Sequence, residues 1–199
     1  MDDESDAALI AASLDQPGRF GPLFDRHATV LHRYLVRRIG PDDADTLVGE
    51  VFRIAFEKRH TYDLTRPLAR PWLYGIATNL LARHRRREAR RYHAMARLAA
   101  QRVPAVELDD RVSDVFDAAG RWERVAAAVA DLPEPERDAL ILHVWEGLSY
   151  EEVAGALDIP VGTVRSRLNR ARGRLRELAA PSGGEMATTD HRDPGRIGS

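Results

Sequence analysis

The sequence predicts an all-α protein made of two small helical domains joined by a flexible linker. Three observations support this prediction. Apolar residues recur at steps of three and four along most of the 199-residue chain, which is the period of a helix. No stretch alternates apolar and polar residues as a half-buried strand does. Charge is segregated along the chain, with two arginine-rich blocks set apart by an acidic one.

The first expected domain covers residues 18–89. Its first helix follows from the helical spacing of apolar residues between Phe20 and Ile39, and Gly40-Pro41 closes it. A second helix is expected over about residues 43–58. A third begins near Trp72, presents an apolar face, and runs out into the arginine-rich sequence ARHRRREARR. Residues 1–17, with five acidic residues and no base up to residue 15, form an N-terminal segment.

The linker and the second domain follow from changes in composition. Residues 90–118 have weak periodicity, a proline and an acidic cluster, so we expect a linker with some helix at its edges. Residues 119–179 form a second helical group. The tail, residues 180–199, is polar and rich in glycine and proline, and it cannot bury enough apolar surface to fold alone.

The clearest local signal lies in LSYEEVAGALDIPVGTVRSRLNRARGRLREL, residues 148–178. Ser149 followed by Glu152 is a capping box, so a helix starts at Tyr150 and is expected to end by Leu157. The sequence Asp-Ile-Pro at 158–160 makes a turn, and its proline suits the first turn of a second helix. Two helices joined by so short a turn predict a helix-turn-helix.

The second helix of this motif is strongly basic. Its apolar residues recur at steps of four and three from Val164, so the polar side chains point elsewhere, mostly outward. The set expected to enter a DNA major groove is Arg165, Ser166, Asn169, Arg170 and Arg172. A merely solvated helix end is the alternative, because the helix dipole favours cations near a C-terminus, but it does not explain Arg165 near the N-terminal end.

Other function classes lack their sequence signals. The chain has no cysteine, no apolar run of membrane-spanning length, and no basic start typical of a secretory signal. Its seven histidines are scattered, and neither a phosphate-binding glycine loop nor a nucleophile elbow occurs. We therefore expect a cytoplasmic protein without membrane insertion, cofactor, metal or catalytic activity.

Two blocks of the chain resemble a known family. LPEPERDALILHVWEGLSYEEVAGALDIPVGTVRSRLNRARGRLREL resembles region 4 of bacterial extracytoplasmic-function (ECF) sigma factors. FGPLFDRHATVLHRYLVRRIGPDDADTLVGEVFRIAFEKRHTYDLTRPLARPWLYGIATNLLARHRRR resembles their region 2. The resemblance spans about residues 6–178, and both blocks stand in the order of the family.

The resemblance implies a dissociable subunit of RNA polymerase that directs core enzyme to promoter DNA and helps to open it. Its partners would be the polymerase clamp and flap, and the free chain would be a monomer; an anti-sigma factor is left open. The five polar residues of the basic helix would read the minus-35 element. The loop of residues 60–69 would capture an unstacked base of the minus-10 element, whose implied contacts are Tyr62, Asn79, Arg83, Arg86 and Arg87.

The same resemblance places a polymerase-binding face on the segment DADTLVGEVF, which is similar to the family sequence DAEDLVQEVF. The implied residues share one side of a helix and are Asp45, Thr46, Gly49, Glu50 and Arg53. Thr46 and Gly49 replace the usual Asp and Gln, and an interior glycine costs a helix about 0.8 to 1 kcal/mol relative to alanine. Pro71 is a further departure, and it predicts that the third helix starts there.

A stand-alone helix-turn-helix regulator is the competing interpretation. It accounts for residues 148–178 but gives no role to the DADTLVGEVF face or to the basic third helix. The sequence also offers no obvious dimerisation element for such a regulator.

Overall fold

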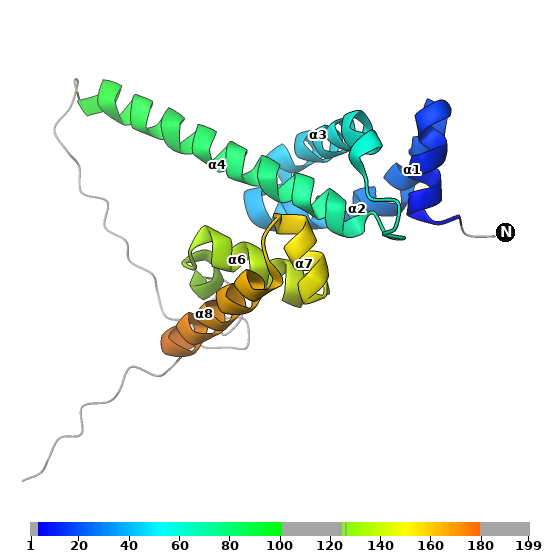
Figure 1. The fold of residues 1–199 in the computed structure, drawn as a ribbon. Helices are drawn as coiled ribbons and strands as arrows, with labels where there is room; N and C mark the ends of the chain where they lie inside the picture. Colours follow the sequence, from blue (N-terminus) through cyan, green and yellow to red (C-terminus); the bar gives the residue numbers. More distant parts are fainter. Residues whose placement is uncertain (1–3, 101–124, 126, 180–199) are drawn as a thin grey trace, which may run out of the picture.

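The computed structural model describes residues 4–100, 125 and 127–179, and within these ranges it contains helices and no strand (Figure 1). The all-α prediction is confirmed. The α-helices are α1 (Asp6–Asp15), α2 (Gly21–Ile39), α3 (Pro41–Lys58), α4 (Arg70–Ala100), α6 (Glu134–Leu140), α7 (Tyr150–Leu157) and α8 (Val161–Ala179). Short 3-10 turns lie at Pro17–Phe20 and Arg59–Thr61, and a π-helical turn lies at Ile141–Trp145.

The N-terminal module is a bundle in which α2, α3 and the first half of α4 pack together. Its interior contains Tyr34 and Tyr74, both fully buried, with ring centroids 5.1 Å apart. The Tyr34 hydroxyl lies 2.9 Å from the Thr78 hydroxyl, so the buried polar group has a partner. Gly40, with a φ of 83°, allows the sharp turn between α2 and α3, because this conformation is costly for residues with a side chain.

Helix α1 is an element that sequence reasoning missed, since residues 1–17 were expected only as an acidic N-terminal segment. The Ser5 hydroxyl accepts a hydrogen bond from the backbone N–H of Ala8 and so caps the helix. Leu9 and Ile10 are buried against the bundle, and Asp6 is buried too. The segment expected only as an N-terminal extension is therefore part of the module.

Helix α4 extends from the first expected domain into the expected linker, whose edges were predicted to contain some helix. It begins at Arg70, so Pro71 lies in the first turn, where its missing N–H has no helical partner to lose. It continues to Ala100, past the boundary expected at residue 89, because its arginine- and alanine-rich sequence has high helix propensity. The remainder of the expected linker, residues 101–118, and the tail of residues 180–199 lie outside the described residues.

The C-terminal module contains α6, the π turn, α7 and α8. The capping box is confirmed, with the Glu152 N–H donating to the Ser149 hydroxyl at 3.1 Å and the Glu152 carboxylate accepting from the Ser149 N–H at 2.8 Å. Asp158, with a φ of 52°, ends α7 in the left-handed conformation. Pro160 lies one residue before α8, and its carbonyl accepts hydrogen bonds from the first turn.

The two modules pack against each other through α4 and α7 (Figure 1). A Cβ atom built at Gly75 would overlap the backbone carbonyl of Ala156, so only glycine permits this approach. Likewise, a Cβ built at Gly155 would overlap the Arg66 guanidinium. The sequence predicts two modules on a flexible linker, and it does not predict that they touch.

Glu146 is the polar centre of this contact. It is 5% exposed and follows the π turn, a feature often found at functional positions. Its carboxylate accepts a hydrogen bond from the Tyr74 hydroxyl and pairs with Arg37 at 2.5 Å and Arg70 at 3.6 Å. Arg70 also donates to the Glu146 carbonyl at 2.6 Å. A buried carboxylate thus holds three side chains of the other module.

Further ion pairs border Glu146. Arg38, whose side chain is 4% exposed, pairs with Asp138, and Arg85 pairs with Glu134 at 2.6 Å. Every cation in these pairs belongs to the N-terminal module and every anion to the C-terminal one. The modules are therefore complementary in charge where they meet.

Candidate nucleic-acid and polymerase interfaces

Three of the five residues predicted on the basic face of α8 are exposed, and two are half-buried. Val164, Leu168 and Ala171 are fully buried against the rest of the module. Because side chains on the opposite side of a helix then face outward, Arg165 and Asn169 are exposed. Ser166 and Arg172 are half-buried, and the Ser166 hydroxyl donates to the Thr163 carbonyl at 3.0 Å.

Arg170 differs from Arg165 in having an acidic partner within the module. Its Nε lies 3.0 Å from one oxygen of Glu136, and Arg174 lies 3.0 Å from the other. The Glu136 side chain is only 8% exposed, whereas that of Arg170 is 56% exposed. Part of the positive charge at Arg170 is therefore already balanced, and Arg165 offers its charge to solvent more freely.

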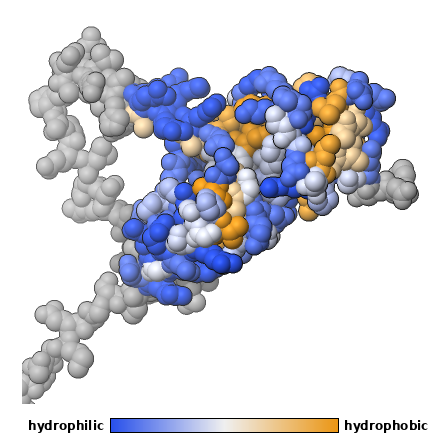
Figure 2. Space-filling view, in the orientation of Figure 1, coloured by the Kyte–Doolittle hydropathy of each residue, from blue (hydrophilic) through white to orange (hydrophobic). Residues whose placement is uncertain are grey.

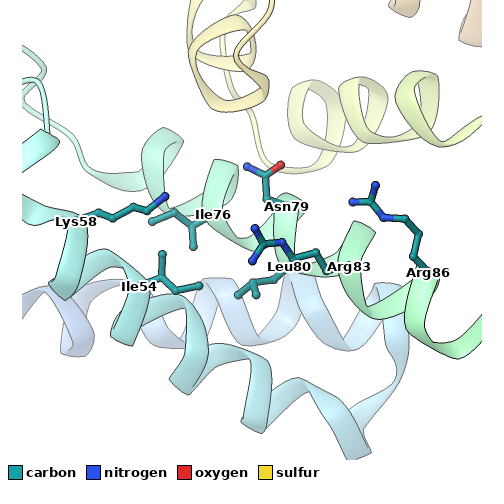
Figure 3. Close-up of a pocket in the computed structure, with 7 residues that line it drawn as sticks. All are labelled: Ile54, Lys58, Ile76, Asn79, Leu80, Arg83 and Arg86. Atoms are coloured by element: carbon teal, nitrogen blue, oxygen red, sulfur yellow. The ribbon is translucent and has the colours of Figure 1, made fainter.

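The exposed side of α4 borders a hollow of about 330 Å³ between α3 and α4. Figure 3 shows Asn79, Arg83 and Arg86 reaching toward it from α4, with Lys58 across from them on α3. Ile54, Ile76 and Leu80 complete the lining. Cationic and amide groups around an apolar floor suit a nucleotide, because phosphates need cations and sugars or bases need apolar contact. Arg87 is exposed nearby but does not line the hollow.

Tyr62 differs from the other four residues predicted to contact the minus-10 element. It is 7% exposed, its ring packs on Trp72 with centroids 5.0 Å apart, and its hydroxyl donates to the Arg66 carbonyl at 2.7 Å. Burial raises the pKa of the Tyr62 hydroxyl to about 12. Tyr62 therefore supports the loop from within. Leu64 and Leu68, 49% and 57% exposed, are the large apolar side chains that face solvent there.

The predicted polymerase-binding residues lie on the outer side of α3. Asp45, Thr46, Gly49 and Arg53 are exposed, and Glu50 is half-buried. Arg53 forms ion pairs with Glu50 and with Glu57, and the hydrogen bond from Arg53 lowers the pKa of Glu50. A Cβ atom built at Gly49 would have no neighbour within 4 Å, so packing does not require glycine there.

Asp6 is a polar site that sequence reasoning missed. It is 4% exposed, and its carboxylate lies 2.8 Å from His27 Nε2 and 3.1 Å from Arg26 Nη1. It also accepts a hydrogen bond from the backbone N–H of Ala69 at 2.9 Å. Burial alone would raise the pKa of Asp6, but the His27, Ala69 and Arg26 interactions outweigh it and lower the pKa from 3.8 to about 2.

This pKa shift predicts how the Asp6→Asn change affects stability. A carboxylate with a lowered folded-state pKa stabilises the fold above pH 3.8 and loses this effect as the pH falls through 2. The shift corresponds to about 2 kcal/mol, so we expect Asp6→Asn to lower the unfolding free energy by about this much at pH 7. Urea unfolding should show the difference shrinking below about pH 4. A difference that stays constant down to pH 2.5 contradicts this account.

On the face shown in Figure 2, apolar side chains gather over α1, near α3 and α4, and over α7, between areas that are hydrophilic. Within the described residues, no helix combines the length and apolar character needed to cross a membrane. The same part of the chain brings no three His, Asp or Glu side chains together as a metal site.

Comparison with known proteins matches both modules. Residues 23–91 match the family model for Sigma-70 region 2, and residues 122–175 match that for Sigma-70, region 4. The chain is 33% identical over 190 residues to the ECF RNA polymerase sigma factor SigE of Mycolicibacterium smegmatis, covering 94% of this chain and 72% of that protein.

Solved structures match over both modules as well. CnrH in complex with the cytosolic domain of CnrY has a TM-score of 0.61 at 26% identity, covering 87% of this chain and 96% of CnrH. The sigma factor RpoE in complex with the anti-sigma factor NepR from Bartonella quintana has a TM-score of 0.60 at 23% identity, covering 83% of this chain and 99% of RpoE.

Proposed function

The chain belongs to the ECF RNA polymerase sigma factors, and we propose that it binds core RNA polymerase through α3 and places α8 on the minus-35 element and α4 on the minus-10 element. The observation that carries this proposal is the presence of two separate exposed cationic helix faces and one exposed polar face in a single chain. We also propose that the chain has no catalytic role. We propose that it acts in the cytoplasm, where promoter DNA would be.

Helix α8 would read base edges in the major groove. Arg165 can donate two hydrogen bonds to guanine and Asn169 can pair with adenine, and both are exposed. Ser166, Arg170 and Arg172 would contribute further contacts, with Arg170 suited to a phosphate because Glu136 restrains it.

The hollow beside α4 would hold the strand that is separated at the minus-10 element. Asn79, Arg83 and Arg86 line it, and Arg87 continues the cationic surface along the helix. Extruding a base costs a few kcal/mol, so a site that captures one must supply both stacking surface and backbone contacts. The exposed Leu64 and Leu68 of the neighbouring loop would supply apolar contact, with Tyr62 beneath them.

Binding both elements at once would require the modules to separate. The two elements are named for positions minus 35 and minus 10, so they lie about 25 base pairs apart. At about 3.4 Å per base pair, this is about 85 Å of duplex. In the structure, α4 and α7 are in contact, with Gly75 against Ala156. We therefore propose that the contact between α4 and α7 opens when the chain acts on a promoter.

Two partner assignments complete the proposal. The C-terminal module would also contact the polymerase flap, and the free chain would be a monomer. RpoE is matched in its complex with the anti-sigma factor NepR, and we propose a protein of that kind as a regulator here. A stand-alone regulator is less consistent with the exposed polar face of α3.

Association with core polymerase is the direct test. Purified full-length chain should co-elute with core enzyme and support initiation at a small set of sites from a promoter library. A stand-alone regulator would bind DNA without co-eluting. Failure to co-elute, or initiation without site preference once bound, contradicts the proposal.

The Glu50→Arg change tests the polymerase-binding face. It reverses a charge in the middle of that face and puts a second cation beside Arg53, so we expect core affinity to fall by about 2 kcal/mol or more. Affinity of the same full-length variant for minus-35 duplex DNA should be unchanged. Fluorescence titration with labelled chain measures both quantities.

Glu57→Arg is the matched control. Glu57 also pairs with Arg53 on α3 but lies outside the five predicted residues. If both changes weaken core binding equally, loss of the Arg53 ion pairs is responsible, and Glu50 has no direct role. Equal loss of core and DNA binding by Glu50→Arg would indicate misfolding.

A further inference from the structure

Helix α1 contacts both ends of the loop that lies between α3 and α4. At the start of the loop, Arg59 Nε donates to the Ser13 carbonyl of α1 at 3.3 Å, and its Nη1 donates to the Phe56 carbonyl at 2.6 Å. At the end of the loop, the backbone N–H of Ala69 donates to the Asp6 carboxylate at 2.9 Å. One short helix thus fixes where the loop leaves α3 and where it enters α4.

The contact at the Asp6 end of the loop involves more elements than the contact at the Arg59 end. Ala69 is fully buried, and its carbonyl accepts the first hydrogen bond of α4, from the Leu73 N–H. The Asp6 carboxylate therefore lies at the N-terminus of α4, where the helix dipole favours negative charge. Arg26 contacts the other oxygen of Asp6, and His27 contacts the carboxylate as well. Both residues belong to α2, so Asp6 also ties this point to α2. Asp6 joins three elements at a single buried group.

The interior of the loop is held by its own hydrogen bonds, while its tip faces solvent. Asp63 accepts hydrogen bonds from both the N–H and the hydroxyl of Thr65, and the Arg66 N–H donates to the Asp63 carbonyl at 3.0 Å. Leu64 and Leu68 stand exposed on this frame. Such a preformed loop keeps its shape as a unit, so its position depends on the two ends that α1 holds.

We propose that Asp6 is a positioning residue for recognition of the minus-10 element, acting through Ala69 on the loop and on the first turn of α4. The proposal rests on the function proposed above for that loop. Asp6 is buried and does not face DNA, so it would influence base preference only by fixing the loop relative to the hollow beside α4. A small misplacement of groups that position a substrate is known to be costly.

The test compares Asp6→Ala, Asp6→Asn and Asp15→Asn in the full-length chain with core polymerase. Asp15→Asn is the matched control, because it removes the same charge from the same helix at an exposed position. A library of promoters randomised only in the minus-10 element gives the base preference of each variant by sequencing of transcripts. A second library, randomised only in the minus-35 element, measures the preference of the other module.

We expect Asp6→Ala to reduce minus-10 discrimination by about 3- to 30-fold while minus-35 discrimination and core affinity stay unchanged. Asp6→Asn should fall between Asp6→Ala and wild type, because its amide oxygen can still accept from Ala69 but its charge is lost. Asp15→Asn should match wild type. Selective loss at one promoter element is a result that general destabilisation does not produce.

Two results would overturn this inference and leave the proposed function standing. In the first, wild type discriminates among minus-10 sequences and both Asp6 variants keep the same preference. In the second, the variants lose discrimination equally at both promoter elements and also lose core affinity, which indicates a purely structural role. If Asp6→Ala does not fold, as judged by circular dichroism, the comparison of Asp6→Asn with Asp15→Asn decides. Absence of any minus-10 preference in wild type would remove the proposed function of the loop, and this inference with it.

Discussion

Replacing Arg165 by alanine is expected to reduce discrimination at the minus-35 element by about 1 to 3 kcal/mol, or about 5- to 150-fold. Arg165 is exposed near the N-terminal end of α8, where a cation is disfavoured by the helix dipole and no structural role accounts for it. Competition binding of the polymerase complex to promoters that differ only in the minus-35 element measures the effect.

Arg167→Ala is the control for this result. It removes the same charge from the same helix, two residues along and about 200° around the axis, so it lies on the other side. It should lower affinity only slightly and leave the preference among minus-35 sequences intact. If Arg165→Ala weakens all promoters equally, Arg165 contacts a phosphate, and its assignment to base reading is wrong.

Replacing Gly75 by alanine is expected to open the contact between the two modules. The added Cβ would overlap the Ala156 carbonyl, which is backbone and cannot swing aside. Overpacking of this kind costs about 1 to 3 kcal/mol, enough to shift the ratio of closed to open chains by about 5- to 150-fold. Helix α4 itself should gain up to about 1 kcal/mol, because alanine favours a helix more than glycine does.

Energy transfer between two dyes reports this opening. The chain has no cysteine, so cysteines introduced at the exposed Asp25 and Glu177 can be labelled selectively, one in each module. Transfer should decrease in Gly75→Ala, and affinity of the free chain for DNA carrying both elements should increase.

Gly173→Ala provides the comparison, because a Cβ there meets nothing within 4 Å. It should leave the transfer efficiency unchanged while making the same chemical substitution in a helix. Equal transfer in wild type and Gly75→Ala would show that the contact between α4 and α7 tolerates the extra atom or is not formed in solution.

The parts of the fold that depend on near neighbours in the sequence could be predicted well. The capping box at Ser149 and Glu152, the end of α2 at Gly40 and the apolar stripe from Val164 are set by hydrogen bonds and spacings within one or two turns. The exposure of Arg165 and Asn169 followed from the same stripe. The outer face of α3 was predictable for the same reason.

The surroundings of individual side chains could not be predicted in the same way, because they depend on contacts beyond the helix that carries each residue. Tyr62 was expected to contact DNA, but the Arg66 carbonyl and the Trp72 ring hold it inside. Arg170 was expected to face DNA, and the sequence does not predict that Glu136 of α6 pairs with it. Helix α1 was missed because burial of Asp6 depends on Arg26, His27 and Ala69, which are remote in sequence.

The sequence by itself determined most of the helices and their exposed faces, because helix formation and its periodic burial are local properties of the chain. Its two motif blocks carry the resemblance to the family. Only the tertiary structure decided that Asp6 anchors the loop before α4 and that Glu146 joins the two modules. Both are buried carboxylates, which are stable only when several donors surround them. Those donors come from separate elements, and no local pattern in the sequence records their meeting.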